Sequence, residues 1–174
     1  IIKVLVTVIE VESKYAKDLT KFELESLRWD KVIICTDADV DGFQIRTLLL
    51  TLFYILTPTL IEEGKIYIAE SPLYEIETKK NSYFAYNENE KNRIIGKIKS
   101  DYKIHRSKGL GENDPEMLWK TTMSPETRRL VKITPDEADI TKETFDLLLG
   151  DDLKNRKEFI EEFGEQYISQ SDEI

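Results

Sequence analysis

Cysteine and histidine are nearly absent from this sequence, with one of each in 174 residues. A lone cysteine, Cys35, excludes an internal disulfide and favours a reducing compartment. The lone histidine, His105, has no other histidine or cysteine to join it, which argues against a role as a metal ligand. No apolar run approaches the roughly 20 residues of a membrane span, so we expect no membrane segment and a cytoplasmic protein.

The first residues, Ile1 to Lys3, include neither an initiator methionine nor a signal-peptide pattern, so we expect a piece of a longer protein. Basic residues are also fewer than acidic ones: the chain has 25 Lys and Arg against 34 Asp and Glu, which gives a net charge of −9. A field of this sign repels nucleic acid. Any contact with DNA must therefore come from local basic groups, from a metal ion or from a partner chain.

Three aspartates spaced by two follow an apolar run in the segment from Val32 to Gly42. The continuous hydrophobicity of Val32 to Cys35 is typical of a buried strand in a parallel sheet. Asp37, Asp39 and Asp41 come at the carboxyl end of this strand, where open α/β sheets bind their ligands. Three carboxylates this close repel one another unless protons or a cation relieve them. Mg²⁺ does so by binding one or two carboxylates and several waters.

Two interpretations of this acidic loop predict little chemistry. A calcium EF-hand is excluded because the last ligand position of its loop requires a glutamate, and Leu48 stands there. The segment before the loop is also strand-like rather than helical. A solvated turn or a helix cap is the other interpretation, and for a single aspartate it would be the natural one.

Two further interpretations predict an active site. A phosphatase of the haloacid-dehalogenase type would use Asp37 as nucleophile, Asp39 as general acid, Lys108 on the phosphate and Gly150-Asp151-Asp152 as a late metal-binding pair. That mechanism leaves Asp41 without a role, and no strand precedes the late pair. A metal site for phosphodiester chemistry uses all three aspartates, and the basic turn around Lys108 supplies phosphate contacts.

The rest of the chain alternates helical and strand-like segments. Residues 44–56 have apolar side chains three and four apart, which predicts a helix that buries Ile45, Leu48, Leu49, Leu52, Phe53 and Leu56. Pro58 should interrupt this helix and Gly64 should end it. We expect strands at 65–69, 73–77, 81–87, 102–105 and 128–133. We expect helices at 116–122, 137–149 and 151–163, and a further helix that starts at residue 124. Residues 89–99 are expected to form a short polar helix or a loop that ends near Gly96. Residues 1–11 favour a strand by composition, but their apolar positions do not alternate, so the end of a buried helix is the alternative.

Most aromatic side chains are assigned to packing rather than to chemistry. Tyrosines in strand-like segments are expected to pack and not to act as nucleophiles: Tyr67, Tyr74, Tyr83 and Tyr86. The two tryptophans, Trp29 and Trp119, are also expected to pack. The acidic helices after residue 137 should turn an apolar face inward, made of Phe145, Leu148, Leu149, Leu153 and Phe159.

Longer blocks of the sequence carry a resemblance to a known family. Asp37-Ala-Asp-Val-Asp-Gly42, followed by Ile45-Arg-Thr-Leu-Leu-Leu50, resembles the B subunits of bacterial type IIA DNA topoisomerases, the family of DNA gyrase and topoisomerase IV. The resemblance continues in the same order through Pro58–Gly64, Ile66–Ala69, Pro72–Tyr74, Lys108–Glu112, Leu118–Trp119, Thr121–Met123, Pro125–Arg129 and Phe159–Glu161. We expect gyrase rather than topoisomerase IV, although the domain that distinguishes them lies in the partner protein.

The resemblance implies a Toprim fold, which is an α/β fold with a Rossmann-like parallel sheet and flanking helices. We expect this domain at residues 1–112, incomplete at its N-terminus, and a mainly helical C-terminal tail segment at residues 113–174. Over residues 1–12 the resemblance implies a helix rather than a strand.

The resemblance also implies sites for metal and DNA. Asp37 and Asp39 would bind Mg²⁺ directly, and Asp41 would be a ligand or a group just outside the ligand shell; Mn²⁺ or Ca²⁺ could substitute. The DNA-binding residues implied in the same way are Gln44, Arg46, Arg106, Lys108 and Gly109.

The implied activity is ATP-dependent cleavage, passage and religation of double-stranded DNA in an A2B2 complex. The A subunit would supply the tyrosine that attacks DNA, and ATP would act through an ATPase domain outside these residues. Three departures from the family stand out: a Glu-Gly-Asp-Ser-Ala motif that completes the metal site is missing, Phe43-Gln44 replaces the usual Ser-His, and Glu75 replaces a lysine. We therefore expect this chain alone to cleave no DNA and to bind Mg²⁺ weakly.

Overall fold

The computed structural model of the chain describes residues 24–107, 109–135 and 138–166. Its elements, in chain order, are η2 (Leu24–Ser26), β1 (Val32–Ile34), α2 (Val40–Leu56), α3 (Pro58–Glu62), β2 (Ile66–Ala69), β3 (Tyr74–Thr78), β4 (Ser82–Ala85), α4 (Glu88–Ile95), β5 (Tyr102–Arg106), η3 (Leu110–Glu112), α5 (Pro115–Leu118), the π-helical turn η4 (Trp119–Met123), β6 (Leu130–Lys132), α6 (Ala138–Leu149) and α7 (Leu153–Phe163). The predicted mixture of helices and strands is confirmed.

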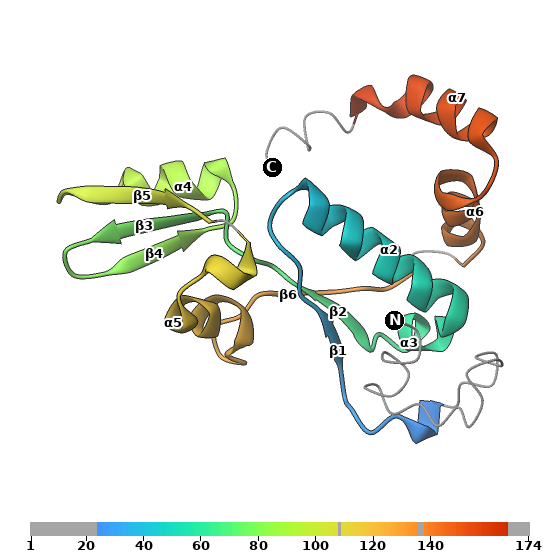
Figure 1. Ribbon diagram of the computed structural model, residues 1–174, viewed down its shortest axis with the longest axis horizontal. Coiled ribbons are helices and arrows are strands. Elements are labelled where there is room, and N and C mark those ends of the chain that lie inside the picture. Colours follow the sequence, from blue (N-terminus) through green and yellow to red (C-terminus); the bar gives the residue numbers. More distant parts are fainter. Residues whose placement is uncertain (1–23, 108, 136–137, 167–174) are drawn as a thin grey trace.

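A central sheet holds strands β1, β2 and β6, with β2 in the middle (Figure 1). The β1–β2 pair is parallel, with Ile33 opposite Tyr67, as the apolar run before the acidic loop predicted. The β2–β6 pair is antiparallel, so the sheet is mixed rather than wholly parallel. Cys35 was expected inside the strand, but β1 ends at Ile34 and Cys35 is exposed beyond it.

Helix α2 packs on the central sheet and begins earlier than predicted, inside the acidic loop. The core between them is formed by Ile34, Phe53, Leu60, Ile61, Ile66 and Ile68. Leu49, Leu50 and Tyr54 of α2 pack against this cluster. The predicted apolar face was therefore partly wrong, because Ile45 and Leu48 are each more than half exposed. The buried stripe is turned toward Leu50 and Tyr54 instead.

The break after α2 follows the sequence. Pro58 has no backbone N–H to continue the helix, and it starts the separate helix α3 as its first residue. Gly64 then takes a positive φ of 62°, a conformation that glycine adopts without strain, and turns the chain into β2. The structure thus confirms both predicted stop signals.

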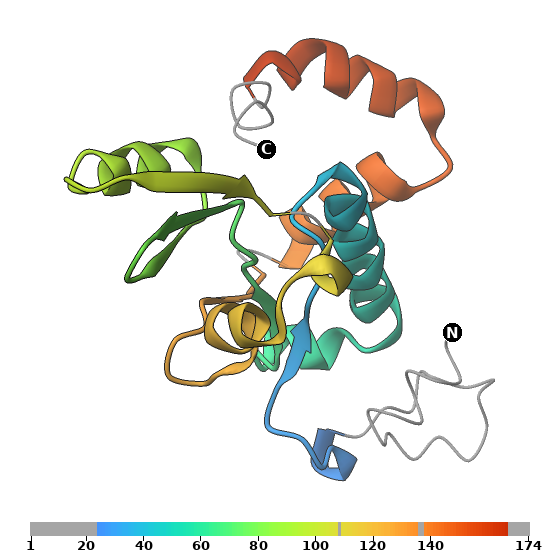
Figure 2. The same cartoon turned by 60° about the vertical axis from the view of Figure 1, so that its left-hand side comes forward.

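A second, antiparallel sheet has the strand order β4-β3-β5. Its centre is Ile76, which lies opposite Tyr83 on one side and Ile104 on the other and is fully buried. Helix α4 packs on this sheet, and the Asn87 side chain caps its first turn by accepting a hydrogen bond from the Glu90 N–H at 2.8 Å. Figures 1 and 2 show this unit projecting away from the central sheet.

The C-terminal part departs from several predictions. Residues 124–127 form a turn and not a helix, since the π-helical turn η4, in which Thr121 and Thr122 are buried, ends directly before them. Trp29 and Trp119 are more than half exposed and so are not core residues. In the two last helices, Leu149 and Leu153 are also exposed, whereas Phe145 stacks on Tyr54 at a ring-centroid distance of 4.5 Å.

The predictions for residues 1–12 fall outside the described residues. Within the ranges that are described, no helix is long and apolar enough to cross a membrane.

Candidate functional site

The acidic loop lies between the carboxyl end of β1 and the first turn of α2. Asp39 is the N-cap of this helix, and its Oδ1 atom accepts a hydrogen bond from the Gly42 N–H at 2.7 Å. The cap satisfies one of the free amides at the helix start, and the positive end of the helix dipole favours negative charge there. Asp41 is exposed within the first helical turn.

Gly42 allows the helix start to approach the loop. A Cβ atom on this residue would lie 2.0 Å from the backbone oxygen of Asp37 and 2.8 Å from its carbonyl carbon. Both atoms belong to the backbone and cannot rotate away. The glycine that closes the acidic motif is therefore required by space.

Asp37 is held by a segment from much later in the chain. The backbone N–H of Leu110 donates a hydrogen bond to Asp37 Oδ1 at 2.7 Å, across 73 positions of sequence. The neighbouring Gly109 lies so close that a Cβ atom there would be 3.2 Å from Asp37 Oδ2. A hydrogen bond from an amide to a carboxylate is stronger than one between neutral groups, so this contact fixes the carboxylate at the strand end.

The donor set suits a hydrated divalent cation. The two hydrogen bonds use Oδ1 of Asp37 and Oδ1 of Asp39, which leaves Oδ2 of each outside these bonds. The described residues contain no group of three or more His, Cys, Asp or Glu side chains placed to hold a metal. Mg²⁺ commonly binds through one or two carboxylates and keeps several waters. Asp37 and Asp39 are thus the residues that would hold such an ion, and a ligand set of all three aspartates stays a prediction.

The predicted DNA-binding residues on α2 differ in their surroundings. Gln44 is exposed, whereas Arg46 is half-buried and points back into the protein. Its Nη2 donates to Thr36 Oγ1 at 3.2 Å, and its guanidinium carbon lies 4.6 Å from the centre of the Phe43 ring. Burial lowers the pKa of Arg46. Phe43 thus stacks on Arg46.

The other predicted residues lie in or after β5. Arg106 is exposed at the end of this strand, opposite Tyr74. Lys108 lies outside the described residues, and Gly109 lies beside Asp37. Sequence reasoning overlooked Leu110, because a backbone amide leaves no mark in a sequence. The only signal was the glycine spacing around it.

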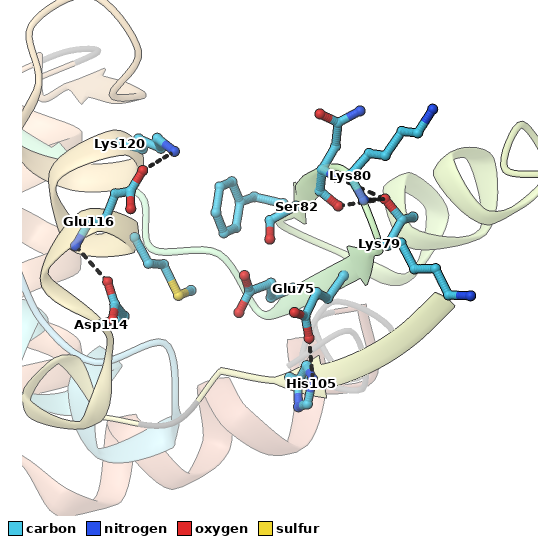
Figure 3. Close-up of a pocket in the computed structure, with 13 residues that line it drawn as sticks. Glu75, Lys79, Lys80, Ser82, His105, Asp114, Glu116 and Lys120 are labelled. Carbon is cyan, nitrogen blue, oxygen red and sulfur yellow. Dashed lines mark hydrogen bonds and ion pairs between the residues drawn. The ribbon is translucent and has the colours of Figure 1, made fainter. Parts of the chain in front are cut away.

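A separate hollow lies between the β4-β3-β5 sheet and α5 (Figure 3). Its volume is about 720 Å³, and its walls carry Glu75, His105, Asp114 and Glu116. His105 Nε2 lies 3.4 Å from Glu77 Oε2, so this histidine pairs with a carboxylate. Of the predicted metal and DNA residues that the structure describes, none lines this hollow.

Comparison with known proteins links both parts of the chain to one kind of protein. The family model described as "Toprim domain" matches residues 1–71, and the model described as "DNA gyrase B subunit, carboxyl terminus" matches residues 99–161. The acidic loop lies in the first match, and Leu110 lies in the second.

Individual relatives agree with these two matches. The chain is 48% identical over 145 residues to the DNA gyrase B subunit of Metamycoplasma hominis, which covers 82% of this chain and 22% of that protein. It is 46% identical over 144 residues to the DNA gyrase B subunit of Thermotoga maritima, and this match covers 80% of this chain and 22% of that protein. It is 45% identical over 143 residues to the DNA gyrase B subunit of Staphylococcus aureus, and this match covers 81% of this chain and 22% of that protein. The chain thus spans about a fifth of the length of these relatives.

Proposed function

Because the chain belongs to the DNA gyrase B family, we propose that it forms the metal-holding part of a DNA cleavage and religation centre. The partners in this proposal are DNA and an A subunit that supplies the attacking tyrosine, in an A2B2 complex located in the cytoplasm. ATP would be hydrolysed by another part of the B subunit. The A and B subunits together would cut, pass and reseal double-stranded DNA.

One observation carries the proposal: Asp37 is positioned by the Leu110 amide at the carboxyl end of β1. A carboxylate that is already fixed needs little reorganisation when it binds a cation. Asp39 is fixed in the same way by its cap on α2. Both residues direct negative charge to the place where open α/β sheets bind ligands.

The residues of this chain would bind and orient rather than attack. Bound Mg²⁺ would supply charge stabilisation for the attacking and leaving oxygens of the phosphodiester. Asp37 and Asp39 would hold the cation, and Gln44 and Gly109 would lie near the DNA backbone. The half-buried Arg46 would support the loop through Thr36.

The decisive test is Asp37→Asn in a complete B subunit that is reconstituted with its A subunit. We expect supercoiling and cleavage-complex formation to fall by at least about 100-fold, since groups that only support metal ligands already contribute about 10- to 100-fold. Asp151→Asn, at an exposed position between α6 and α7, is the matched control and should retain activity. Full activity of Asp37→Asn, with normal thermal unfolding, would instead indicate a non-catalytic interaction module.

The phosphatase alternative finds less support. Asp151 and Asp152, its late acidic pair, lie between two helices and not at a strand end. Asp152 caps α7, accepting hydrogen bonds from the N–H groups of Lys154 and Asn155. We expect no hydrolysis of p-nitrophenyl phosphate, and hydrolysis that Asp37→Asn abolishes would reverse this conclusion.

A further inference from the structure

The free end of the β4-β3-β5 sheet carries five lysines, which we call the basic tip: Lys79, Lys80, Lys97, Lys99 and Lys103. The first two lie in the turn between β3 and β4, the next two lie between α4 and β5, and the last is in β5. The register places Thr78 opposite Tyr102, so the end of β3 and the start of β5 meet at this tip. Figures 1 and 2 show that this end points away from the central sheet.

The tip contrasts in charge with the chain as a whole. Five lysines face two carboxylates there, Glu77 and Asp101, in a chain of net charge −9. The structure shows no ion pair between any of the five and another described residue, and Glu77 pairs with His105 instead. The basic tip therefore keeps a net positive charge within an acidic chain.

Two of the five lysines, Lys79 and Lys103, line one hollow. The lining of this hollow, of about 380 Å³, also includes Glu77, Thr78, Asp101 and Tyr102. In Figure 3 the side chains of Lys79 and Lys80 extend away from α5, and both residues are exposed. Tyr83 and Tyr102 are each about two-fifths exposed, at 39% and 40%, and add hydroxyl donors.

We propose that the basic tip is a second contact for double-stranded DNA, which it holds by the phosphate backbone. Lysine ammonium groups bind phosphates as point charges and read no base sequence. The tip offers no arginine fork to recognise bases, so binding there is independent of sequence. The choice of DNA as the polyanion rests on the proposed function.

The tip is within reach of a duplex that lies at the acidic loop. Tyr102 at the tip and Leu110 at Asp37 are eight residues apart. A chain of that length spans at most about 29 Å, or about eight base pairs at about 3.4 Å each. A duplex of about 30 base pairs can therefore touch both places, since its length is about 100 Å at that rise.

The test compares two triple variants with the same change in net charge. The tip variant is Lys79→Gln/Lys80→Gln/Lys99→Gln, and the control is Lys120→Gln/Lys154→Gln/Lys157→Gln, on α5–η4 and α7. Fluorescence anisotropy with a duplex of about 30 base pairs gives the affinity of the chain from about 50 to about 200 mM salt. The salt slope is the slope of the logarithm of affinity against the logarithm of salt concentration. We expect this slope to be up to about 2.7 less steep in the tip variant than in the unaltered chain. The loss of affinity between the two salt concentrations is then up to about 40-fold smaller for the variant. The control should keep the unaltered slope.

Three results of this binding assay would overturn the proposal: no DNA binding by the unaltered chain, an unchanged slope in the tip variant, or an equal loss of slope in both variants, which would indicate bulk charge. A tip variant that loses supercoiling in the reconstituted enzyme but keeps its DNA affinity would also overturn it, and would indicate an acidic protein partner. The binding of DNA by the basic tip and the metal-holding role of Asp37 can each fail independently of the other. Asp37→Asn should leave the salt slope of the chain unchanged and affect only DNA cleavage.

Discussion

Gly109→Ala should disturb the acidic loop through a single contact. The new Cβ atom would lie 3.2 Å from Asp37 Oδ2, 3.5 Å from its Cγ and 3.6 Å from its Oδ1. The backbone of Gly109, with φ −60° and ψ 152°, is open to alanine without strain. The carboxylate must therefore shift by a few tenths of an ångström, which lengthens its hydrogen bond from the Leu110 amide.

The magnitude follows from the strength of that bond. A hydrogen bond to a charged group contributes about 1.5–3 kcal/mol, and partial weakening should remove about 1 kcal/mol. Replacing glycine by alanine also stabilises by about 0.4–1 kcal/mol, because it restricts the unfolded chain. Gly111→Ala is the matched control, since nothing lies within 4 Å of a Cβ atom there. The control isolates the unfolded-state effect.

Thermal unfolding followed by circular dichroism should place Gly109→Ala about 2–4 °C below Gly111→Ala. Asp37→Ala removes the hydrogen-bond acceptor, so in that background Gly109→Ala should show only the unfolded-state gain that Gly111→Ala shows. The double-mutant cycle should thus give a coupling free energy of about 1 kcal/mol. Equal midpoints for the two alanine variants, or a coupling of zero, would refute the reasoning.

Three further predictions concern other parts of the fold. Gly42→Ala forces a Cβ atom to 2.0 Å from the Asp37 backbone oxygen, and urea unfolding should show a loss of more than about 2 kcal/mol. Ile66→Ala empties a fully buried position in the central sheet and should lose about 2–5 kcal/mol in the same assay. Glu90→Gln removes a carboxylate whose pKa is lowered by the hydrogen bond from Arg129. Because a lowered pKa stabilises the fold above about pH 4.3, this variant should be less stable by about 0.5 kcal/mol at pH 7 after solvent screening, and the difference should disappear as the pH falls below about 4.

The elements that could be predicted from sequence are those with local causes. The strand before the acidic loop is marked by its continuous apolar run, and the break at Pro58 follows from a missing N–H. The turn at Gly64 follows from a conformation that glycine favours. Each of these signals acts within a few residues, so no tertiary information was needed.

The buried face of α2 could not be predicted, because apolar residues occupy most positions of this helix and all but one from Leu48 to Leu56. Ile45 and Leu48 fit a helical stripe as well as Leu50 and Tyr54 do, and only the packing of the central sheet selects the second set. The exposed Trp29 shows the same limit, since side-chain type predicts burial only on average.

The acidic loop illustrates why a site can be predicted only in part. Its aspartates are visible in the sequence, but their positioning depends on a contact across the division between the two family matches. Asp37 lies within residues 1–71, whereas the Leu110 amide lies within residues 99–161. Strand β6 also belongs to the second match and pairs with β2 of the first. Residues 1–71 alone would lack both the donor to Asp37 and one neighbour of the central strand. The second match is therefore part of the proposed metal-holding unit, and the expected boundary at residue 112 cuts through the central sheet.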